Sequence, residues 1–461
     1  MKKIITLIIA ISMGLALLAG CGTKKVADGK VHITIAAWPS EETNPAKYEL
    51  YQGYLEEYKK LYPDVEVTTD EWRFDLKNYL VKAASKTLPT TFTTAPTELD
   101  TLVNSGYIKD LTKELKKYHY LENYNEDYKN AYMRDGKVYA VVDPTTVYQM
   151  GLVINAKIFK EAGLVNDDGT IMFPQTWEDV AEYGKIIKEK TGKAGFVMPT
   201  KNRHGGWQFM NIAWSYGANF VEQDKDGKWK AVFDSEECAN ALQYVKDLKW
   251  KYDILQDNIL VDIGGVQEYV GTYRAGIGIM QSSMVAPIPK NYNTALTDLA
   301  MCRIPEGPKG RYSVSSANIY VVNADATDEE VEALMNWFNL IGMGPEVSDV
   351  MAEKWEADYR VKAEEGQIVG IKPSMIWKDG ERKDAQIAAM GKYINVDTKL
   401  FDDYAITEKI TFKGDPEKCA QELYDVLDAA IQEVLNDKNS DVKDVLKKAA
   451  NDFQLNFLDK E

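Results

Sequence analysis

Segments typical of β-strands alternate with segments typical of α-helices along most of this chain. Residues 31–36 alternate apolar and polar side chains, and residues 45–62 place tyrosine and leucine at helical spacing before Pro63. A second strand-like segment, residues 65–68, follows directly. This alternation favours parallel sheets with helices packed on them, an α/β fold. Because a single core rarely grows past roughly 250–300 residues, the 461 residues are expected to form two or three domains.

Several of the predicted helices begin with clear capping signals. Thr176 is followed by Asp179 three residues later, Ser235 precedes an apolar stripe, and Thr327 forms a capping box with Glu330. The apolar stripes that follow these caps are interpreted as core faces, and no chemistry is assigned to them.

The N-terminus resembles the signal of a bacterial lipoprotein. A basic start is followed by an apolar run from Ile4 to Leu18, which is shorter than the ~20 residues of a comfortable membrane span. The run ends in Leu-Ala-Gly-Cys at residues 18–21, which resembles a lipobox, although a small-residue helix end with an incidental cysteine is the alternative. We therefore expect residues 1–20 to be removed, Cys21 to carry the lipid and residues 21–30 to be a polar tether. The acyl chains would hold the protein on the outer face of the cell membrane.

Charge and motif content exclude several classes of function. The formal net charge is −16, or −18 once residues 1–20 are removed, and such a chain repels the phosphate backbone of nucleic acid. Three histidines are little material for histidine catalysis or zinc binding. The chain contains no phosphate-binding P-loop and no Gly-x-Ser-x-Gly elbow, and Gln281 stands where a dinucleotide fingerprint needs its third glycine. With 71 acidic residues, chance carboxylate pairs are guaranteed, so a glycosidase pair cannot be argued.

Two smaller features are interpreted as structural. Residues 222–227 look like the start of a calcium loop, but Phe233 stands where a bidentate glutamate is needed, so Asp226-Gly227 is predicted to be a hairpin turn. Residues 166–169 are likewise predicted to be a turn, with a cation site left open. The cysteines of the mature chain after Cys21 are interpreted as structural, with one disulfide among them left open: Cys238, Cys302 and Cys419.

Motifs further along the chain resemble those of one protein family. Residues 151–164, GLVINAKIFKEAGL, are similar to its tyrosine-asparagine-lysine-x-leucine-phenylalanine and alanine-glycine-leucine signature, with Val153 in place of the first aromatic residue. The later landmarks follow in the family's order at Pro174–Asp179, Phe233–Glu236, Tyr273–Met280, Ile304–Pro308 and Ser313–Asn323. The chain thus resembles the family 1 extracellular solute-binding proteins of carbohydrate ABC importers, which are maltodextrin-binding-protein-like lipoproteins.

This resemblance implies a two-lobed periplasmic-binding-protein-like fold of type II, with mixed or parallel sheets flanked by helices and a hinge of crossing strands. The first lobe would be residues 31–147 plus 314–344, and the second residues 148–313 plus 345–461. A mono- or oligosaccharide would bind between the lobes, which would close around it and present a surface to the permease subunits. The protein would be a monomer without enzymatic activity, catalytic residues, cofactor, metal or nucleic-acid partner, and would meet the membrane only through its lipid.

A neutral sugar has apolar faces and a rim of hydroxyl groups, so its site is expected to combine aromatic and hydrogen-bonding side chains in loops and at strand ends. Trp38 directly follows the first predicted strand, with packing at a sheet edge as its alternative. By resemblance, Thr93 and Thr94 lie in a ligand-contacting loop and Tyr148 lies where the lobes cross, with Asp143 nearby.

The second lobe contributes further candidates. Arg203 and His204 precede two glycines that would bring backbone close to a ligand, and Trp207 stands near the point where the family stacks an aromatic residue on sugar. Trp214 is a weaker candidate, with core packing as its alternative.

The last candidates depart from the family's pattern or lie near the hinge. Many relatives place an aromatic sugar platform where this chain has Gln281, Ser282 and Ser283, which leaves the stacking scheme and the sugar open. Ser316 and Asn318 lie near the presumed hinge.

The leading hypothesis is a lipid-anchored receptor that delivers a carbohydrate, expected to be an oligosaccharide, to an ABC importer. Two rivals stay open from the sequence: an anchored extracellular polysaccharide lyase or glycosidase, and a lipoprotein that binds a polyamine, a peptide or a metal.

Overall fold

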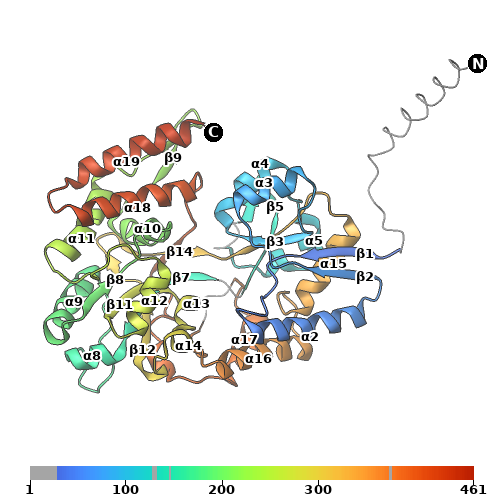
Figure 1. The fold of residues 1–461 in the computed structure, drawn as a ribbon, viewed down its shortest axis with the longest axis horizontal. Coiled ribbons are helices and arrows are strands. Elements are labelled where there is room, and N and C mark those ends of the chain that lie inside the picture. The colour runs from blue at the N-terminus through green and yellow to red at the C-terminus, as the bar shows by residue number, and fades with distance from the viewer. Residues whose placement is uncertain (1–28, 127–131, 145–146, 373–375, 461) are drawn as a thin grey trace, which may run out of the picture.

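The computed structural model describes residues 29–126, 132–144, 147–372 and 376–460. They form two α/β lobes that lie side by side, with the N-terminal strands in one lobe and the C-terminal helices in the other (Figure 1). Each lobe has its own main sheet and its own buried core. Within these ranges, no helix combines the length and the apolar character that crossing a membrane requires.

The sheet of the first lobe has five strands in the order β2-β1-β3-β15-β6. The strands predicted at residues 31–36 and 65–68 are present, and their β-branched side chains suit a half-buried sheet. β1 is parallel to β2 and β3, whereas β15 is antiparallel to β3 and β6. The strands are β1 (Val31–Ile35), β2 (Val65–Thr69), β3 (Thr91–Thr94), β6 (Ala140–Val142) and β15 (Ile319–Val322).

Aromatic residues fill the core of the first lobe. Tyr58, Phe92 and Trp337 are buried between the sheet and its helices. The helix predicted at residues 45–62 is confirmed, with Tyr62 as its C-cap. The helices are α2 (Pro45–Leu61), α3 (Leu76–Ala84), α4 (Leu99–Ser105), α5 (Thr112–Lys117), α6 (Tyr120–Asn123) and α15 (Asp328–Leu340), with a 3-10 turn η1 (Pro96–Glu98) and a small hairpin of β4 (Met133–Arg134) and β5 (Lys137–Val138).

The larger sheet of the second lobe runs β13-β14-β7-β11-β8, with β12 paired to β7 and β16 paired to β14. β11 is antiparallel to β7 and parallel to β8, so this sheet is mixed. Its strands are β7 (Tyr148–Asn155), β8 (Ala194–Val197), β11 (Ala275–Gln281), β12 (Leu299–Arg303), β13 (Glu306–Gly307), β14 (Gly310–Ser316) and β16 (Ile410–Lys413).

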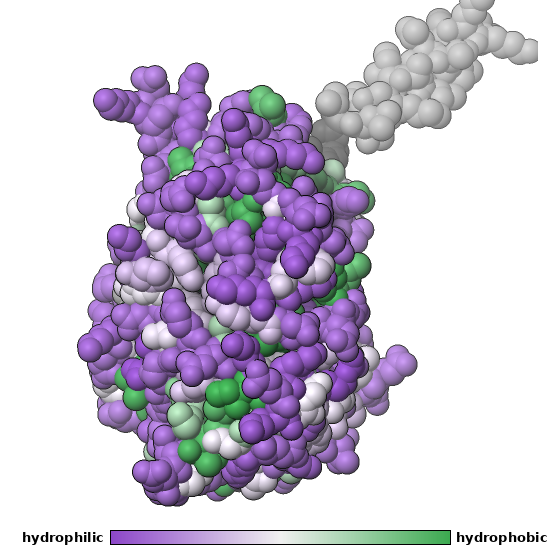
Figure 2. All heavy atoms as spheres, turned by 90° about the vertical axis from the view of Figure 1, so that its left-hand side faces the viewer, coloured by the Kyte–Doolittle hydropathy of each residue, from purple (hydrophilic) through white to green (hydrophobic). Residues whose placement is uncertain are grey.

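Helices cover this sheet, and the predicted caps are confirmed. Thr176 and Asp179 form a capping box, as Thr327 and Glu330 do in the first lobe, and the Ser235 hydroxyl accepts the N–H of Cys238. The helices are α8 (Ala156–Ala162), α9 (Trp177–Thr191), α10 (His204–Tyr216), α11 (Glu236–Trp250), α12 (Ile263–Gly271), α13 (Ser282–Val285), α14 (Ile288–Tyr292), α18 (Ala420–Asn436) and α19 (Val442–Asn456), with 3-10 turns η2 (Leu296–Asp298), η3 (Thr398–Leu400) and η4 (Leu458–Lys460). The face of this lobe turned away from the first is mostly hydrophilic (Figure 2).

The segment after residue 344 divides between the lobes, whereas the sequence assigned it to the second lobe alone. α16 (Asp349–Glu364) packs on α2, and α17 (Glu381–Gly391) packs on α16 (Figure 1). Trp377 is buried in the first-lobe core, where its ring centre lies 5.0 Å from that of Tyr124. α18 and α19 instead pack with α10 and α11 in the second lobe.

The features interpreted as structural are found in structural positions. Asp226-Gly227 turns the hairpin of β9 (Val221–Gln223) and β10 (Trp229–Ala231), with Gly227 at a φ of 78°. Residues 166–169 also form a turn, in which the N–H of Asn166 donates to the Thr170 carbonyl. The open question of a disulfide is answered, since the cysteines of the described part are free: Cys238, Cys302 and Cys419.

Candidate functional site

The two main sheets present strand ends to each other where the chain crosses between the lobes. In the first sheet, Thr94 and Val142 are the register partners of Ile319. In the second sheet, Ser316 is paired with Tyr148, and two residues separate it from the start of β15. Strand ends that meet at such a crevice are a favoured place for ligands in α/β proteins.

Several predicted residues come together at this crossing. Thr93 and Thr94 end β3, Gln281 ends β11 and Ser316 ends β14. The backbone N–H of Asp143, directly after β6, donates to the carbonyl of Asn318 over 2.9 Å. Tyr148 begins β7, and its side chain lies outside the described part of the structure.

Some polar groups at these strand ends are buried without a hydrogen-bond partner in the part of the chain described. They are Thr94 Oγ1, Gln281 Oε1 and Ser315 Oγ. Since a buried polar group without a partner costs free energy, such groups are suited to bind water or the hydroxyl groups of a ligand.

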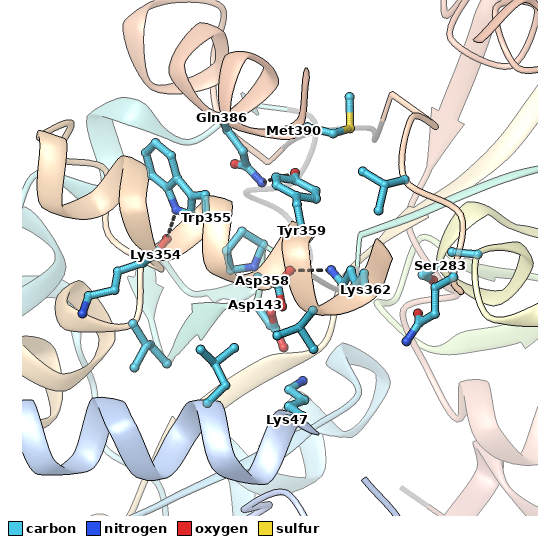
Figure 3. A pocket seen from close by; sticks show the side chains of 18 of the residues that line it. Lys47, Asp143, Ser283, Lys354, Trp355, Asp358, Tyr359, Lys362, Gln386 and Met390 are labelled. Atoms are coloured by element: carbon cyan, nitrogen blue, oxygen red, sulfur yellow. Dashed lines mark hydrogen bonds and ion pairs between the residues drawn. The ribbon is translucent and has the colours of Figure 1, made fainter. Parts of the chain in front are cut away.

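One cavity of about 370 Å³ is lined by both lobes, within the size range of small-molecule sites. We call it the α2 cavity, because one face of α2 lines it with Lys47, Tyr51 and Tyr54. Asp143 borders it at the β6–β7 crossing, and the second lobe contributes Ser282, Ser283, Ala286 and residues 368–371. The remaining wall comes mainly from α16 and α17 and from the segment 341–343 (Figure 3).

Ion pairs order much of the α2 cavity wall. The Lys362 ammonium nitrogen lies 2.5 Å from a carboxylate oxygen of Asp358, and Lys354 forms an ion pair with Glu57 of α2. Burial by itself would raise the pKa of the Asp358 carboxyl, but the adjacent Lys362 ammonium outweighs it and the pKa is lowered. Asp358 is therefore charged at neutral pH.

Arg382 holds another part of this wall together. Its guanidinium donates to the carbonyls of Gly342 and Gly344 at 3.0 Å each and lies 3.9 Å from the ring centre of Trp355. Burial lowers the pKa of Arg382 to about 9, so the group stays charged at neutral pH. The indole of Trp355 also donates to Gly342, which fixes the aromatic wall.

A second cavity, of about 1,240 Å³, also bridges the lobes and shares no lining residue with the first. We call it the α10 cavity, after Trp214 of α10, and Trp229 of the β9–β10 hairpin lines it as well. The first lobe contributes Thr97 and the ion pair of Arg134 with Asp100. Ser315, the end of β16 and the segment that follows it complete the lining, the last two as residues 412–418.

Trp207 is tied to a buried carboxylate of this region. Its indole N–H donates to Asp415 over 3.0 Å, and the hydroxyl of Tyr424 donates to the same oxygen over 2.5 Å. Burial raises the pKa of the Asp415 carboxyl, although hydrogen bonds from Tyr424, Trp207 and Ser316 act in the other direction. Trp207 is half-buried and does not itself line the cavities described, although its partner Asp415 lines the α10 cavity.

The glycines before Trp207 have a packing role that the sequence did not suggest. A Cβ on Gly205 would lie 2.5 Å from the Asp428 carboxylate, and one on Gly206 would lie 2.5 Å from the Tyr424 carbonyl. The two glycines therefore let α10 approach α18. Asp428 also accepts the backbone N–H groups of Arg203 and Gly206 at 2.7 Å each.

Arg203 and His204 begin α10 and face different surroundings. The Arg203 guanidinium binds Asp425 of α18 over 2.9 Å and lines a third interlobe cavity of about 490 Å³. Burial lowers the pKa of His204 below its usual range, so the ring is neutral at physiological pH.

Trp38 and Trp214 are both packed against other residues, which is the alternative to ligand binding that the sequence left for each of them. Trp38 is buried against Tyr51 and Trp337, with ring centres 5.5 Å apart in each pair, and does not line the cavities described. Trp214 is only 3% exposed, yet it reaches the α10 cavity, where the Lys413 ammonium lies 5.4 Å from its ring centre.

Sequence reasoning missed most of the α2 cavity. The sequence indicates only a helical spacing for Tyr51 and no role for Trp355, Tyr359 and Lys362, although these three share one face of α16 at positions i, i+4 and i+7. An unusual mixture of aromatic and charged residues on that face was the available signal. In the described ranges, no group of three or more histidine, cysteine, aspartate or glutamate residues is arranged to hold a metal.

Comparison with known proteins places the chain among binding proteins. A family model described as bacterial extracellular solute-binding protein matches residues 42–340. The arabinooligosaccharide-binding protein of Halalkalibacterium halodurans is 28% identical over 127 residues, which are 28% of this chain. That match spans 25% of the length of the relative.

Solved structures resemble the whole fold. The GacH receptor of Streptomyces glaucescens, studied unliganded and with acarbose, has a TM-score of 0.66 at 15% identity, covering 93% of this chain and 99% of its own. Maltose-bound MalE3 of T. maritima has a TM-score of 0.65 at 17% identity, covering 93% and 100%. At these identities the likeness is one of fold.

Proposed function

The chain belongs to the bacterial extracellular solute-binding protein family, and from this premise we propose that it is a lipid-anchored receptor that binds a carbohydrate between its lobes and delivers it to an ABC importer. The family and the structural neighbours are binding proteins rather than enzymes. The proteins that this chain resembles include binders of arabinooligosaccharide and maltose, which supports a carbohydrate as the ligand.

One observation carries this proposal. Two cavities lined by both lobes combine aromatic side chains with hydrogen-bonding groups, and the strand ends between them carry buried polar atoms without partners in the described chain. This combination suits a sugar, because aromatic rings cover its C–H faces while amides, hydroxyls and carboxylates bind its hydroxyl groups.

The sequence candidates at this crossing are the proposed ligand contacts, together with residues that only the structure brings in. Hydroxyl and amide groups would come from Thr94, Gln281, Ser282 and Ser283, and Asp143 would accept hydrogen bonds from sugar hydroxyl groups. The aromatic surfaces would be Tyr51 and Tyr359 in the α2 cavity and Trp214 and Trp229 in the α10 cavity. Trp207 would add a ring beside Asp415, which lines the α10 cavity. Because each cavity has walls in both lobes, a bound ligand would favour hinge closure.

A glycan panel tests the function. Purified protein lacking residues 1–20 is titrated with neutral and acidic mono- and oligosaccharides, and tryptophan fluorescence and thermal unfolding are recorded. Binding stabilises the native state, by about 2.7 kcal/mol at a ligand concentration 100 times Kd. We expect a saturable response and no product by chromatography after long incubation. Product formation would establish an enzyme instead, and a response to polyamines or peptides alone would establish another kind of receptor.

The anchor is tested separately in a bacterial host fed a clickable palmitate analogue. The full-length chain is expected to take up the label and stay with the cell, whereas Cys21→Ala is expected to stay unlabelled, because it lacks the thiol that would carry the lipid. Equal labelling of both proteins would rule out Cys21 as the lipidated residue.

A further inference from the structure

The α2 cavity carries more cationic than anionic side chains, although the chain as a whole is strongly acidic with a net charge of −16. The cations that line it are Lys47, Lys354, Lys362 and Arg382, against the carboxylates Asp143, Asp358 and Glu365. Four of these groups are held in three ion pairs: Lys354 with Glu57, Lys362 with Asp358, and Glu365 with Lys290. The charges outside these pairs are Lys47, Arg382 and Asp143, which leave an excess of one positive charge.

Lys47 is the cation available to a ligand. In the part of the chain described, its ammonium has no carboxylate within 4.0 Å, and its contact is the Tyr51 ring, 5.4 Å from the ring centre. Lys47 stabilises the charge of Asp358, but Lys362 already holds that carboxylate at 2.5 Å. In Figure 3, Lys47 rises from α2 toward the side where Asp143 and Lys362 lie.

The start of α2 adds a second, independent observation. Asn44 is the N-cap of this 17-residue helix, yet its side chain does not cap the helix, and the first turn has no acidic residue. The Asn44 Oδ1 atom is buried in the described structure without a hydrogen-bond partner, and Asn44 lines the cavity. Pro45 at the first position has no N–H and the N–H of Tyr48 donates to the Asn44 carbonyl, so the N–H groups of Ala46 and Lys47 remain for a ligand. Together with the partial positive charge of the helix start, they favour an anion.

We propose that the carbohydrate bound in the α2 cavity is acidic, with a uronic acid residue whose carboxylate lies between Lys47 and the first turn of α2. This inference rests on the proposed function and names the class of sugar. The Asn44 oxygen and Asp143 suit the hydroxyl groups of the same residue, since both accept hydrogen bonds. Tyr51 supplies an aromatic surface beside the carboxylate site.

The test compares sugars that differ in one property. Uronate-bearing xylo-oligosaccharides and oligogalacturonides are titrated by calorimetry beside neutral chains of the same length, at low and high salt. We expect the acidic member of at least one pair to bind at least tenfold more tightly, with an advantage that shrinks at high salt. A hydrogen-bonded charge pair of this kind is worth about tenfold to a hundredfold in affinity.

Three variants locate the effect. Lys47→Met removes the charge but keeps much of the stem, and it is expected to lower affinity for the acidic chain at least tenfold and hardly change the neutral one. Lys47→Arg is expected to keep most of the preference. Lys60→Met is the control, because Lys60 is exposed on the same helix and the change in net charge is identical.

The outcomes separate the two proposals. Equal binding of acidic and neutral chains, or equal losses for both in Lys47→Met, would overturn the acidic ligand and leave the carbohydrate receptor intact. If the folded protein binds neither class of sugar, the receptor function fails and the acidic ligand fails with it.

Discussion

The two interlobe cavities differ in how their walls are held. The α2 cavity is the smaller, and charged side chains within its wall already bind one another, as Asp358 and Lys362 do. The α10 cavity is more than three times as large, and its aromatic wall comes from Trp214 and Trp229. The first is suited to bind one sugar residue in a fixed orientation, whereas the second has room for a longer chain and for closure.

This difference suggests a division of labour within the proposed receptor. Pre-organised polar groups give specificity, because a ligand that fails to match them leaves buried charges unpaired. Stacking on tryptophan tolerates many sugars and adds affinity with each residue bound. We therefore expect variants in the α2 cavity to change which sugar binds, and variants in the α10 cavity to change how tightly a long chain binds.

The largest expected effect is on the stability of the α2 cavity wall. Arg382→Ala would remove a buried guanidinium that satisfies the carbonyls of Gly342 and Gly344 and stacks on Trp355. We expect the free energy of unfolding to fall by about 3 kcal/mol or more, since buried acceptors lose their partners. Urea unfolding followed by circular dichroism measures it.

Two control variants sharpen this comparison. Lys383→Ala changes the neighbouring residue, whose ion pair with Asp379 is largely exposed, and should cost little. Arg134→Ala in the α10 cavity breaks a partly exposed pair with Asp100 and is expected to cost less than about 1 kcal/mol. Equal losses for Arg382→Ala and Arg134→Ala would remove the proposed difference in rigidity.

The next effect concerns Trp207, which the sequence proposed as a stacking residue. Trp207→Ala is expected to weaken carbohydrate binding by about 1–3 kcal/mol, the range for losing a desolvated aromatic anchor. Calorimetry with the best glycan of the panel measures it.

Trp207→Phe separates two roles, because phenylalanine keeps an aromatic face but cannot donate to Asp415. If Phe retains most of the affinity, the ring contacts the sugar. If Phe is as weak as Ala, Trp207 acts by positioning Asp415, and stacking is excluded.

The fold was predictable in its main features, because it depends on patterns that the chain repeats. The two-lobed α/β architecture is confirmed, as are the capping boxes at Thr176 and Thr327. The placement of Trp377 was not predictable, because its burial depends on Tyr120 and Tyr124, more than 250 residues earlier.

The candidate site was predictable from the sequence where its residues lie at strand ends, and it was not predictable where they lie on helices. Thr94, Asp143 and Gln281 are candidates from the sequence because they end or follow strands, and their strands lead to the crossing between the lobes. Their role in binding stays a prediction. Tyr51 and Tyr359 were missed because an aromatic residue on an amphipathic helix has the same spacing whether it faces a core or a cavity. Only the packing of α16 against α2 distinguishes the two cases.

A smaller effect is expected from the aromatic wall of the α10 cavity. Trp229→Ala should weaken binding of a long oligosaccharide by about 1 kcal/mol, because a half-exposed ring contributes less than a buried anchor. A series of chain lengths measured by calorimetry should show the loss growing with length. A loss of the same size for a monosaccharide would mean that the two cavities do not divide the ligand in this way.

The smallest effects test the opposite electrostatics of the two cavities. Burial raises the pKa of Asp415, so the folded state binds this proton more readily than the unfolded state, whose carboxyl titrates near pH ~3.9. The Asp415 contribution to stability therefore falls as the pH rises from about 4. Asp358 is the reverse case, because Lys362 lowers its pKa and its contribution is present above about pH 4 and lost on further acidification.

Asparagine at each position removes the titration while keeping an oxygen acceptor, so the two variants should differ in sign. At pH 7, Asp415→Asn is expected to raise the melting temperature slightly above that of the unmodified protein, and Asp358→Asn to lower it. The corresponding changes in the free energy of unfolding should both stay below about 1 kcal/mol and shrink as the pH falls to 4. Thermal unfolding at pH 4, 5.5 and 7 measures them. Differences of the same sign would show that the field of Lys362 does not outweigh burial at Asp358, and the α2 cavity would then lose its contrast with the α10 cavity.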